Sequence, residues 1–284
     1  MKAIPKNTVV IFGMTDVEEA EARKAAESVG YIVATATFQG QLVSASTAYK
    51  ADGFVVDGGL AEELTGAIIF ECNPACAGSL EVVARCDHHN PGDYGFGFPP
   101  ELYFEGSSLG QLLMFLGLKP TEYQLLVAAS DHCPAAAYAG RCQMVTPDAI
   151  RLHRLSEKVA FYAGIPSLAH KADPGILEAI IGKAVTILKS APKFDNGVRD
   201  LRTIGFVEEL PEAALRSGES YVADICDKDR TQKPTGNRKI VLGGHTAPKI
   251  VQDFMSWAAT FPNRVGEPYG DPVRGFAGVI VKPR

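Results

Sequence analysis

Short apolar runs, rich in β-branched residues, alternate with helical patterns in the first part of the chain. Five runs predict strands, at 8–12, 31–34, 54–57, 67–70 and 81–85, and the first, third and fourth of them are typical of buried strands. Between the first two, residues 16–28 are strong helix formers with acidic side chains in the first turn, as the helix dipole favours. Strands that alternate with helices predict βαβ units and a mainly parallel sheet.

The later part of the chain has a different order of elements. A helix opens at Ser107, and further helical patterns cover 121–137, 147–162 and 174–189. Pro192 and the Asp195–Gly197 turn then predict a boundary. Beyond it lie a helical pattern at 247–259 and strand-like runs at 202–208, 219–226, 239–242 and 275–281. We therefore expect an α/β domain over 1–192 and a smaller α+β domain over 193–284, with an active-site cleft between them.

Composition narrows the class of protein. The 284 residues suffice for two domains, and 46% hydrophobic with 21% charged residues is ordinary for a globular protein. The net charge of −5 argues against binding long nucleic acids, which need a basic track. No apolar stretch reaches the roughly 18 residues of a membrane span, and no signal-peptide core precedes the first strand. We expect a cytoplasmic protein that does not bind membranes.

The most informative motif is Asp87-His88-His89, which directly follows the run at 81–85 and precedes the Pro91-Gly92 turn. Consecutive side chains of a strand point to opposite faces, so three metal-capable groups in a row fit best at a strand end. In open α/β sheets ligands collect at the carboxyl ends of the strands. The motif therefore predicts a site there, although a polar loop with incidental histidines is the simpler alternative.

Three further polar turns lie at element ends. They carry Asp16 with Glu18, Glu71, and Asp131 with His132. If these turns converge with Asp87-His88-His89, they supply about four carboxylates and up to three imidazoles. That set suits one or two Mn²⁺ or Mg²⁺ ions that activate water for attack at phosphorus.

This arrangement resembles the DHH phosphoesterase superfamily, named for its Asp-His-His motif. Residues 107–113 are similar to the family's ASSTAELV-type helix, and residues 121–131 to its GIxxDT segment. Met14–Glu18 falls where the family carries His-x-Asp-x-Asp, and Glu71 falls where it carries a bridging aspartate. Residues 241–246 resemble the Gly-Gly-His loop of the associated C-terminal domain. The resemblance covers most of the chain.

The resemblance implies roles for individual residues. The metal ligands would be Asp16, Glu71, His88 and Asp131. The catalytic group would be Asp87, His88 and His89, with His89 contacting phosphate or acting as acid and base. The second domain would bind substrate through Gly243, Gly244, His245, Arg238 and Arg274.

The chain departs from the family pattern at Met14, which replaces a histidine, and at Glu18 and Glu71, which replace aspartates. Thioether sulfur is a poor ligand for hard cations. Three outcomes follow: a single metal held by Asp16, His88 and Asp131; a shifted site that recruits His132 or Glu71; or a metal-free descendant.

The leading hypothesis is a phosphoesterase that acts on a short oligonucleotide, a cyclic dinucleotide or a bisphosphorylated nucleoside. The alternative is a nucleotide-binding or regulatory protein that has lost hydrolysis. A third hypothesis is a thiol enzyme using Cys86 or Cys133, with His88 or His132 as base. The expected partners are a small phosphorylated ligand and, in a homodimer, a second copy of the chain.

Overall fold

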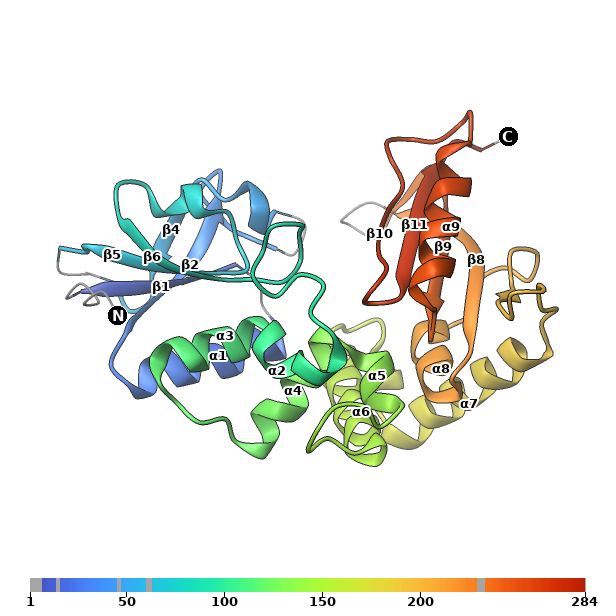
Figure 1. Ribbon diagram of the computed structural model, residues 1–284, viewed down its shortest axis with the longest axis horizontal. Coiled ribbons are helices and arrows are strands. Elements are labelled where there is room, and N and C mark those ends of the chain that lie inside the picture. The colour runs from blue at the N-terminus through green and yellow to red at the C-terminus, as the bar shows by residue number, and fades with distance from the viewer. Residues whose placement is uncertain (1–6, 14–15, 45–46, 60–62, 229–232, 284) are drawn as a thin grey trace. The chain divides into compact units, whose positions relative to one another are not determined.

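The computed structural model describes residues 7–13, 16–44, 47–59, 63–228 and 233–283, and its helices and strands are drawn in Figure 1. The chain divides into two compact units, Met1–His132 and Cys133–Arg284. The predicted boundary at residue 192 falls inside the second unit. Helices that precede residue 192 belong there because they share a hydrophobic core with later elements, as described below.

The first unit is built on a six-stranded, mostly parallel sheet, as the alternating pattern predicts. Its parallel strands are β1 (Thr8–Phe12), β2 (Ile32–Phe38), β5 (Gly66–Phe70) and β6 (Glu81–Cys86), in the order β2-β1-β5-β6. Two short strands, β3 (Gln41–Leu42) and β4 (Gly53–Val56), pair antiparallel with β2. The apolar run at 54–57 is therefore a peripheral strand, and Val55 is exposed.

Alternate residues of β1 pack on opposite faces of this sheet. Val10 and Phe12 face α1 (Val17–Ser28), α3 (Ser108–Leu116) and α4 (Glu122–His132). Val9 and Ile11 face the 3-10 turns at Ala48–Lys50 and Pro74–Ala77. The central strands β1 and β5 are buried on both faces of the sheet. This explains why their sequences are continuous apolar runs.

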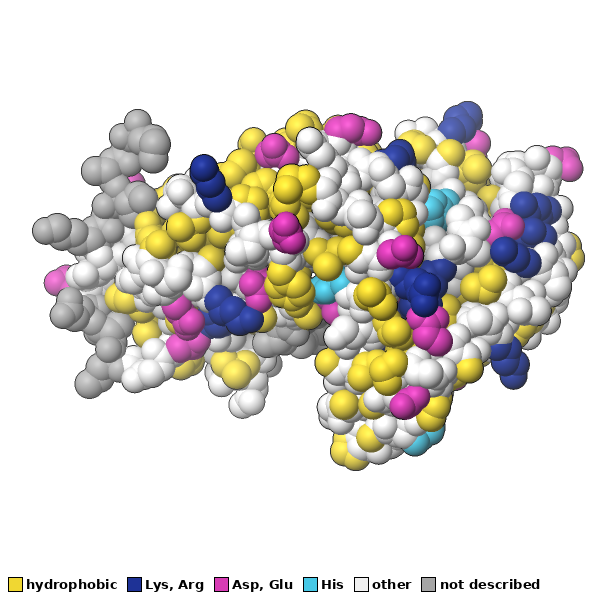
Figure 2. All heavy atoms as spheres, turned by 90° about the horizontal axis from the view of Figure 1, so that it is seen from below, with side chains coloured by type: hydrophobic (Ala, Val, Ile, Leu, Met, Phe, Trp, Pro, Cys, Tyr) yellow, Lys and Arg dark blue, Asp and Glu magenta, His cyan; other side chains and the backbone are white. Residues whose placement is uncertain are grey.

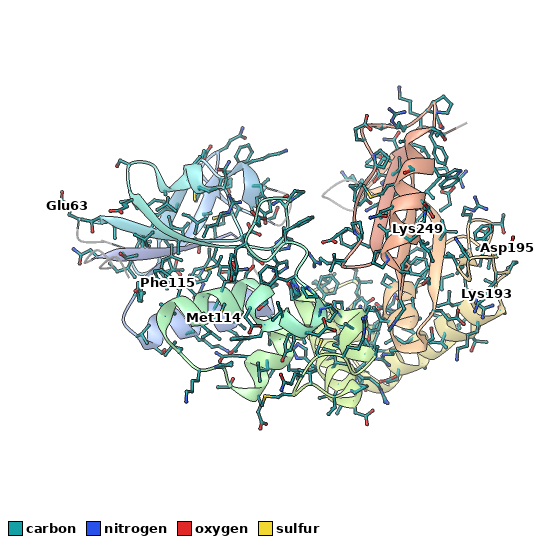
Figure 3. The ribbon with its side chains drawn as sticks, viewed as in Figure 1. Glu63, Met114, Phe115, Lys193, Asp195 and Lys249 are labelled. Carbon is teal, nitrogen blue, oxygen red and sulfur yellow. The ribbon has the colours of Figure 1, made fainter. Side chains whose placement is uncertain are left out.

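The α3 helix shows the same division between buried and exposed sides. Figure 3 labels two adjacent residues of this helix: Phe115 packs against the core, whereas Met114 is largely exposed. Before α3, the chain forms a 3-10 turn at Pro100–Leu102 and the short helix α2 (Tyr103–Gly106).

The carboxyl ends of β1, β5 and β6 lie side by side, because Phe12 pairs with Phe70 and Phe70 pairs with Cys86. Gly13 continues β1 against β5 through a hydrogen bond from its amide to Phe70 O (3.0 Å). A Cβ on Gly13 would lie 2.3 Å from Glu71 O, so only glycine fits this approach. The polar turns that the sequence singles out therefore begin at one edge of the sheet.

The second unit contains a five-stranded sheet in the order β10-β11-β9-β8-β7. Its strands are β7 (Arg199–Asp200), β8 (Ser220–Lys228), β9 (Pro234–Gly244), β10 (Tyr269–Asp271) and β11 (Phe276–Val281). All pairs are antiparallel except β7 with β8.

Helices pack on both faces of this second sheet. Tyr221 and Ala223 of β8 share one core with α6 (Pro147–Ala163), α7 (Pro174–Ser190) and α8 (Leu210–Ser217). The intervening Val222 points to the other face, where α9 (Pro248–Ala259) packs. The short helix α5 (Pro134–Tyr138) and a 3-10 turn at Ala169–Lys171 complete the unit.

Two predicted elements are wrong. The run at 202–208 is not a strand: it turns at Gly205 (φ +85°), and Ile204 and Phe206 are 44% and 79% exposed. The helix predicted over 121–137 is two helices, because Cys133 leaves the helical region (φ −148°) before Pro134. Proline disfavours helical backbone at the residue before it.

The surface agrees with the acidic composition. On the face drawn in Figure 2, the described Lys and Arg side chains are interspersed with Asp and Glu, without a continuous basic track. Every helix in the described part of the chain is too short or too polar to cross a membrane.

Candidate metal centre

Four side chains of the first unit bring one potential metal ligand atom each into a single group. The atoms of Glu18, Glu71, His88 and Asp131 all lie within 4.8 Å of one another. Glu18, Glu71 and His88 are buried, whereas the Asp131 side chain is 30% exposed. Part of the Asp131 side chain therefore reaches solvent, although its Oδ2 atom is buried with the other ligand atoms.

Local backbone geometry at two turns brings the acidic side chains inward. Glu71 leaves β5 in the left-handed region (φ +49°), and its amide donates to Cys86 O (3.1 Å). Asp16 caps α1 by accepting a hydrogen bond from Glu19 N (2.8 Å), which sets Glu18 in the first helical turn. The Glu18 Oε1 atom then accepts a hydrogen bond from Leu109 N at the start of α3 (3.0 Å).

A hydrogen-bond chain fixes the tautomer of His88. Ser108 Oγ donates to Glu71 Oε1 (2.8 Å) and lies 3.2 Å from His88 Nδ1. Because the hydroxyl proton is already directed at Glu71, Nδ1–H of His88 donates to the serine oxygen. The Nε2 lone pair of His88 then points toward Asp131 Oδ2, 3.0 Å away. A lone pair facing a carboxylate oxygen needs a proton or a cation between them.

The buried acids have no cationic partner within the group. Burial, followed by the charge of Asp131, raises the pKa of Glu71 to about 8. Burial, followed by the charges of Asp131 and Glu71, also raises the pKa of Glu18 well above its usual value. Oε2 of Glu18 and Oε2 of Glu71 receive no hydrogen bond from any described residue. Buried charges of this kind are normally paired or bind a metal.

Asp87 and His89 form a second pair beside this group. His89 Nδ1 lies 3.1 Å from Asp87 Oδ1 and 3.5 Å from Glu71 Oε1. Burial alone would raise the pKa of Asp87, but hydrogen bonds from His89 lower it to about 2. An ionised Asp87 accepts the Nδ1 proton of His89, so Nε2 is the nitrogen of His89 that can exchange protons.

Several hydrogen bonds hold Asp87 in place beside the candidate metal ligands. Its carboxylate accepts hydrogen bonds from the amides of His88 (2.8 Å) and His89 (3.1 Å) and from the Tyr49 hydroxyl (3.0 Å). Gln111 binds both the amide and the carbonyl of Asp87. These contacts make Asp87 a positioning residue that orients the two histidines, whose rings stack with centroids 4.5 Å apart.

The donor set fits a divalent cation. Three carboxylates and one imidazole match hard or borderline ions such as Mn²⁺ and Mg²⁺. The unpartnered Oε2 atoms and the lone pair of His88 Nε2 are the atoms left available for it. Ser108 orients the His88 ring through its contact with Nδ1, as the second partners of metal-binding histidines usually do.

The structure brings together three of the four predicted ligands, Glu71, His88 and Asp131. Asp16 is not in the group: its carboxylate is used to cap α1, and the neighbouring Glu18 takes its place. This corresponds to the shifted site with Glu71. His132 does not join it, since its Nε2 lies 3.2 Å from Phe98 O. Met14 lies outside the described residues.

The predicted substrate-binding residues of the second unit lie in different places. Gly243 and Gly244 end β9, and a Cβ on Gly244 (φ +91°) would lie 2.1 Å from Glu219 O. His245 Nε2 donates to Leu215 O (2.8 Å), so this histidine ties β9 to α8. Arg238 lies near the middle of β9, and the Arg274 guanidinium lies over Phe276.

Four residues that support the site are not evident as such from sequence: Glu18 as a ligand, Ser108, Tyr49 and Gln111. The sequence does single out the positions of the first two. Glu18 falls at an aspartate of the DHH pattern described above, and Ser108 falls in the segment similar to the serine-bearing helix of that pattern. Tyr49 and Gln111 reach Asp87 from distant positions in the chain and have no local signal.

Neither Cys86 nor Cys133 provides an activated thiolate near the site. Burial raises the pKa of Cys86. The hydrogen bond between Cys133 and Cys142, followed by burial, raises the pKa of Cys133. Both thiols are therefore protonated at neutral pH, which disfavours the thiol-enzyme hypothesis.

Comparison with known proteins adds no family assignment: the chain matches no protein-family model, and no curated protein is significantly similar to it.

Proposed function

We propose that the protein is a metal-dependent phosphoesterase of the DHH type that hydrolyses a small phosphodiester or phosphomonoester. The observation that carries this proposal is the convergence of Glu18, Glu71, His88 and Asp131, with His89 directly beside them. Buried acids whose nearest possible cation is His89, a histidine that already binds Asp87, are typical of metal-assisted hydrolysis.

The four ligand residues would hold one Mn²⁺ or Mg²⁺ ion. Such an ion supplies Lewis acidity and offsets negative charge on the phosphoryl oxygens. The carboxylates of Glu18 and Glu71 would bind it, and Ser108 keeps His88 in the tautomer that presents Nε2. Asp131 lies on the exposed side of the group, where substrate can approach.

His89 would carry the proton transfer. Asp87 accepts its Nδ1 proton and stays ionised, so His89 can take up or release a proton at Nε2. The His89 side chain is 27% exposed, which leaves it accessible to a substrate oxygen. A histidine oriented by a carboxylate is a suitable general acid and base near neutral pH.

A small substrate follows from charge. The chain carries a net charge of −5, and a long polyanion would need many phosphate contacts from Lys and Arg. A short oligonucleotide, a cyclic dinucleotide or a bisphosphorylated nucleoside needs few contacts beyond the metal itself.

The test is Mn²⁺-dependent hydrolysis of bis-p-nitrophenyl phosphate by wild type, His88→Ala and His89→Ala, with exposed His170→Ala as the matched control. We expect turnover in wild type and His170→Ala, and a loss of at least a hundredfold in the other two. His89→Ala should still bind metal, whereas His88→Ala should not.

Stoichiometric metal without turnover on any phosphoester would instead favour the alternative of a nucleotide-binding protein that has lost hydrolysis. A folded protein with neither metal nor turnover would contradict the phosphoesterase proposal.

A further inference from the structure

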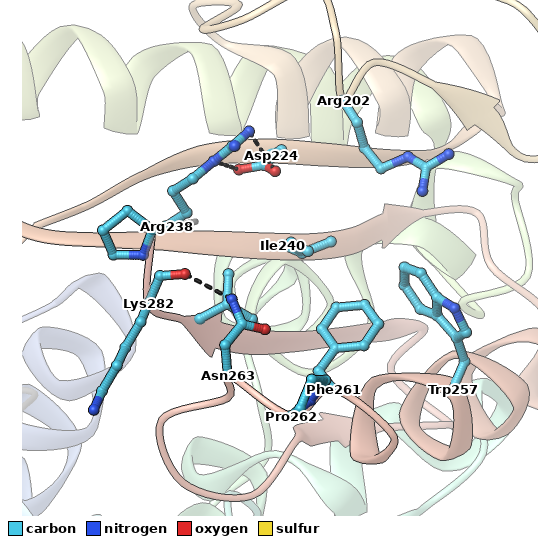
Figure 4. Close-up of a pocket in the computed structure, with 11 residues that line it drawn as sticks. Arg202, Asp224, Arg238, Ile240, Trp257, Phe261, Pro262, Asn263 and Lys282 are labelled. Atoms are coloured by element: carbon cyan, nitrogen blue, oxygen red, sulfur yellow. Dashed lines mark hydrogen bonds and ion pairs between the residues drawn. The ribbon is translucent and has the colours of Figure 1, made fainter.

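The second unit has a groove on the sheet face that α9 covers only in part. The helix packs over β10 and β11 and shares a core with Val222 and Leu242, and the groove lies beside it, next to the exposed Arg238 side chain of β9. A cavity of about 630 Å³ lies there, next to a smaller one of about 340 Å³, and the two share Arg202 and Trp257 (Figure 4). The volume of the larger cavity is within the range of small-molecule sites.

The floor of the groove is made by alternate residues of two paired strands. Val222 pairs with Leu242, and Asp224 pairs with Ile240. The Val222 and Leu242 side chains give the smaller cavity an apolar floor. Asp224 and Arg238 add an ion pair to the floor of the larger one (Figure 4). The floor therefore changes from apolar to polar along its length.

One wall of the groove is aromatic. Trp257 packs edge-on against Phe254 and Phe261, with ring centroids 5.5 and 4.5 Å apart. These contacts hold the indole in place, yet Trp257 remains 40% exposed and lines both cavities. A rigid, partly exposed indole is a stacking surface for a planar ring.

Polar groups of fixed orientation line the rest of the groove: Arg202 opposite the aromatic wall, Arg238 on the floor, and Asn263 at one end. Asp200 binds Arg202 through Nε (2.8 Å) and Nη2 (2.7 Å), and Asp224 binds Arg238 through Nε (2.8 Å) and Nη2 (2.6 Å). Both guanidinium groups keep Nη1 for another acceptor. Asn263 donates through Nδ2 to Lys282 O (2.7 Å), and no described residue donates to its Oδ1.

These features select the class of ligand. An aliphatic ligand would cover the guanidinium and amide groups without offering them a partner, which costs free energy. A purely anionic ligand would meet Asp224 and would not use the indole. A nucleobase has an apolar face and an edge with both donors and acceptors, and so it matches both walls.

We propose that this groove binds the base of a purine nucleotide, stacked on Trp257 with its polar edge toward Arg202, Arg238 and Asn263. The inference goes beyond the proposed function and does not depend on it, because the groove belongs entirely to the second unit and needs no metal. Arg238, which the sequence predicts as a phosphate contact, here serves the base instead.

Trp257 is the only tryptophan of the chain, so its fluorescence reports on the groove directly. The experiment titrates the full-length protein with GMP and AMP in the presence of EDTA. Ribose 5-phosphate, which lacks a base, and guanosine, which lacks a phosphate, serve as matched ligands. We expect saturable quenching by GMP or AMP, similar quenching by guanosine, and none by ribose 5-phosphate.

Variants measured by calorimetry locate the site. Arg238→Gln and Trp257→Ala should each weaken binding about tenfold, the scale of one stacked base. Trp257→Phe, which keeps a ring, should lose less and guards against misfolding. The control is Lys239→Gln, because Lys239 precedes Ile240 on β9 and its ammonium lies over Tyr269, outside the groove.

Equal quenching by ribose 5-phosphate and GMP would overturn the proposal, since the base would then not be recognised. The absence of quenching by GMP, AMP and guanosine at millimolar concentration would overturn it as well. So would binding that survives unchanged in Trp257→Ala and Arg238→Gln.

Discussion

Each unit buries acidic side chains, but with opposite surroundings. In the first unit, burial and neighbouring acids raise the pKa of Glu71 and Glu18. In the second, burial alone would raise the pKa of Glu212, but the charge of Arg154 and the bonds from Tyr138 and Arg216 lower it. Arg154 and Arg216 approach the two Glu212 oxygens to 2.9 and 3.0 Å.

The difference separates a structural acid from a ligand-binding acid. Glu212 is neutralised by its own chain, so it needs nothing from solution. Glu18 and Glu71 lie in a group that offers acceptor atoms and a histidine lone pair, without a described cation. A buried carboxylate indicates a metal site when its partners are other acids, and a structural network when they are arginines.

The largest expected effect concerns the structural network. Glu212→Gln removes the negative charge that pairs with Arg154 and Arg216. Both guanidinium groups then lose their ion pair with this residue. Breaking a buried pair in this way costs about 3–5 kcal/mol. Urea denaturation followed through Trp257 fluorescence measures the effect, because Trp257 lies in the same unit. A loss below about 1 kcal/mol would mean that the network is not structural.

Replacing a glutamate by glutamine should have the opposite effect on the unfolding free energy at the metal centre. Glu18→Gln keeps the acceptor that Leu109 N binds and removes a carboxyl group whose ionised form burial and the neighbouring acids disfavour. We expect the metal-free protein to gain about 1 kcal/mol in unfolding free energy, the scale of one unsatisfied buried group. Denaturation in EDTA, followed by circular dichroism, measures it. Destabilisation of the metal-free protein would remove the contrast with Glu212.

The smallest effect is expected at a more exposed acid of the second unit. Hydrogen bonds from Arg199, outweighing partial burial, lower the pKa of Glu219 to about 2, with Lys193 contributing. A lowered pKa means that the stabilisation is present above the unfolded value near 4.5 and is lost as pH falls toward 2. The melting temperatures of wild type and Glu219→Gln should therefore converge between pH 6 and pH 2.5. A difference independent of pH would contradict the assigned pair.

Much of the first unit was predictable because its signals are local. The apolar runs locate the parallel strands, and the carboxyl ends of such strands meet at one edge. That rule alone brings Glu71 and His88 together. The choice between Asp16 and Glu18 was not predictable, because it depends on which acid caps α1 and which one reaches the start of α3.

The second unit was less predictable because its groove depends on non-local pairing. Asp224 and Arg238 are brought together by the register of β8 and β9, and Trp257 is added by the packing of α9. The false strand at 202–208 has a different, local cause. The exposed residues Ile204 and Phe206 give this segment the sequence pattern of a buried strand. Periodicity alone cannot distinguish an exposed apolar run from a buried one.

The central claim is that the buried acids of the first unit require a cation. The most direct measurement is the electron paramagnetic resonance signal of free Mn²⁺ during titration of wild type, His88→Ala and Glu212→Gln. We predict one bound ion per chain in wild type and Glu212→Gln, and at least a hundredfold weaker binding in His88→Ala. Failure of wild type to bind Mn²⁺, or equal binding by His88→Ala, would contradict the claim.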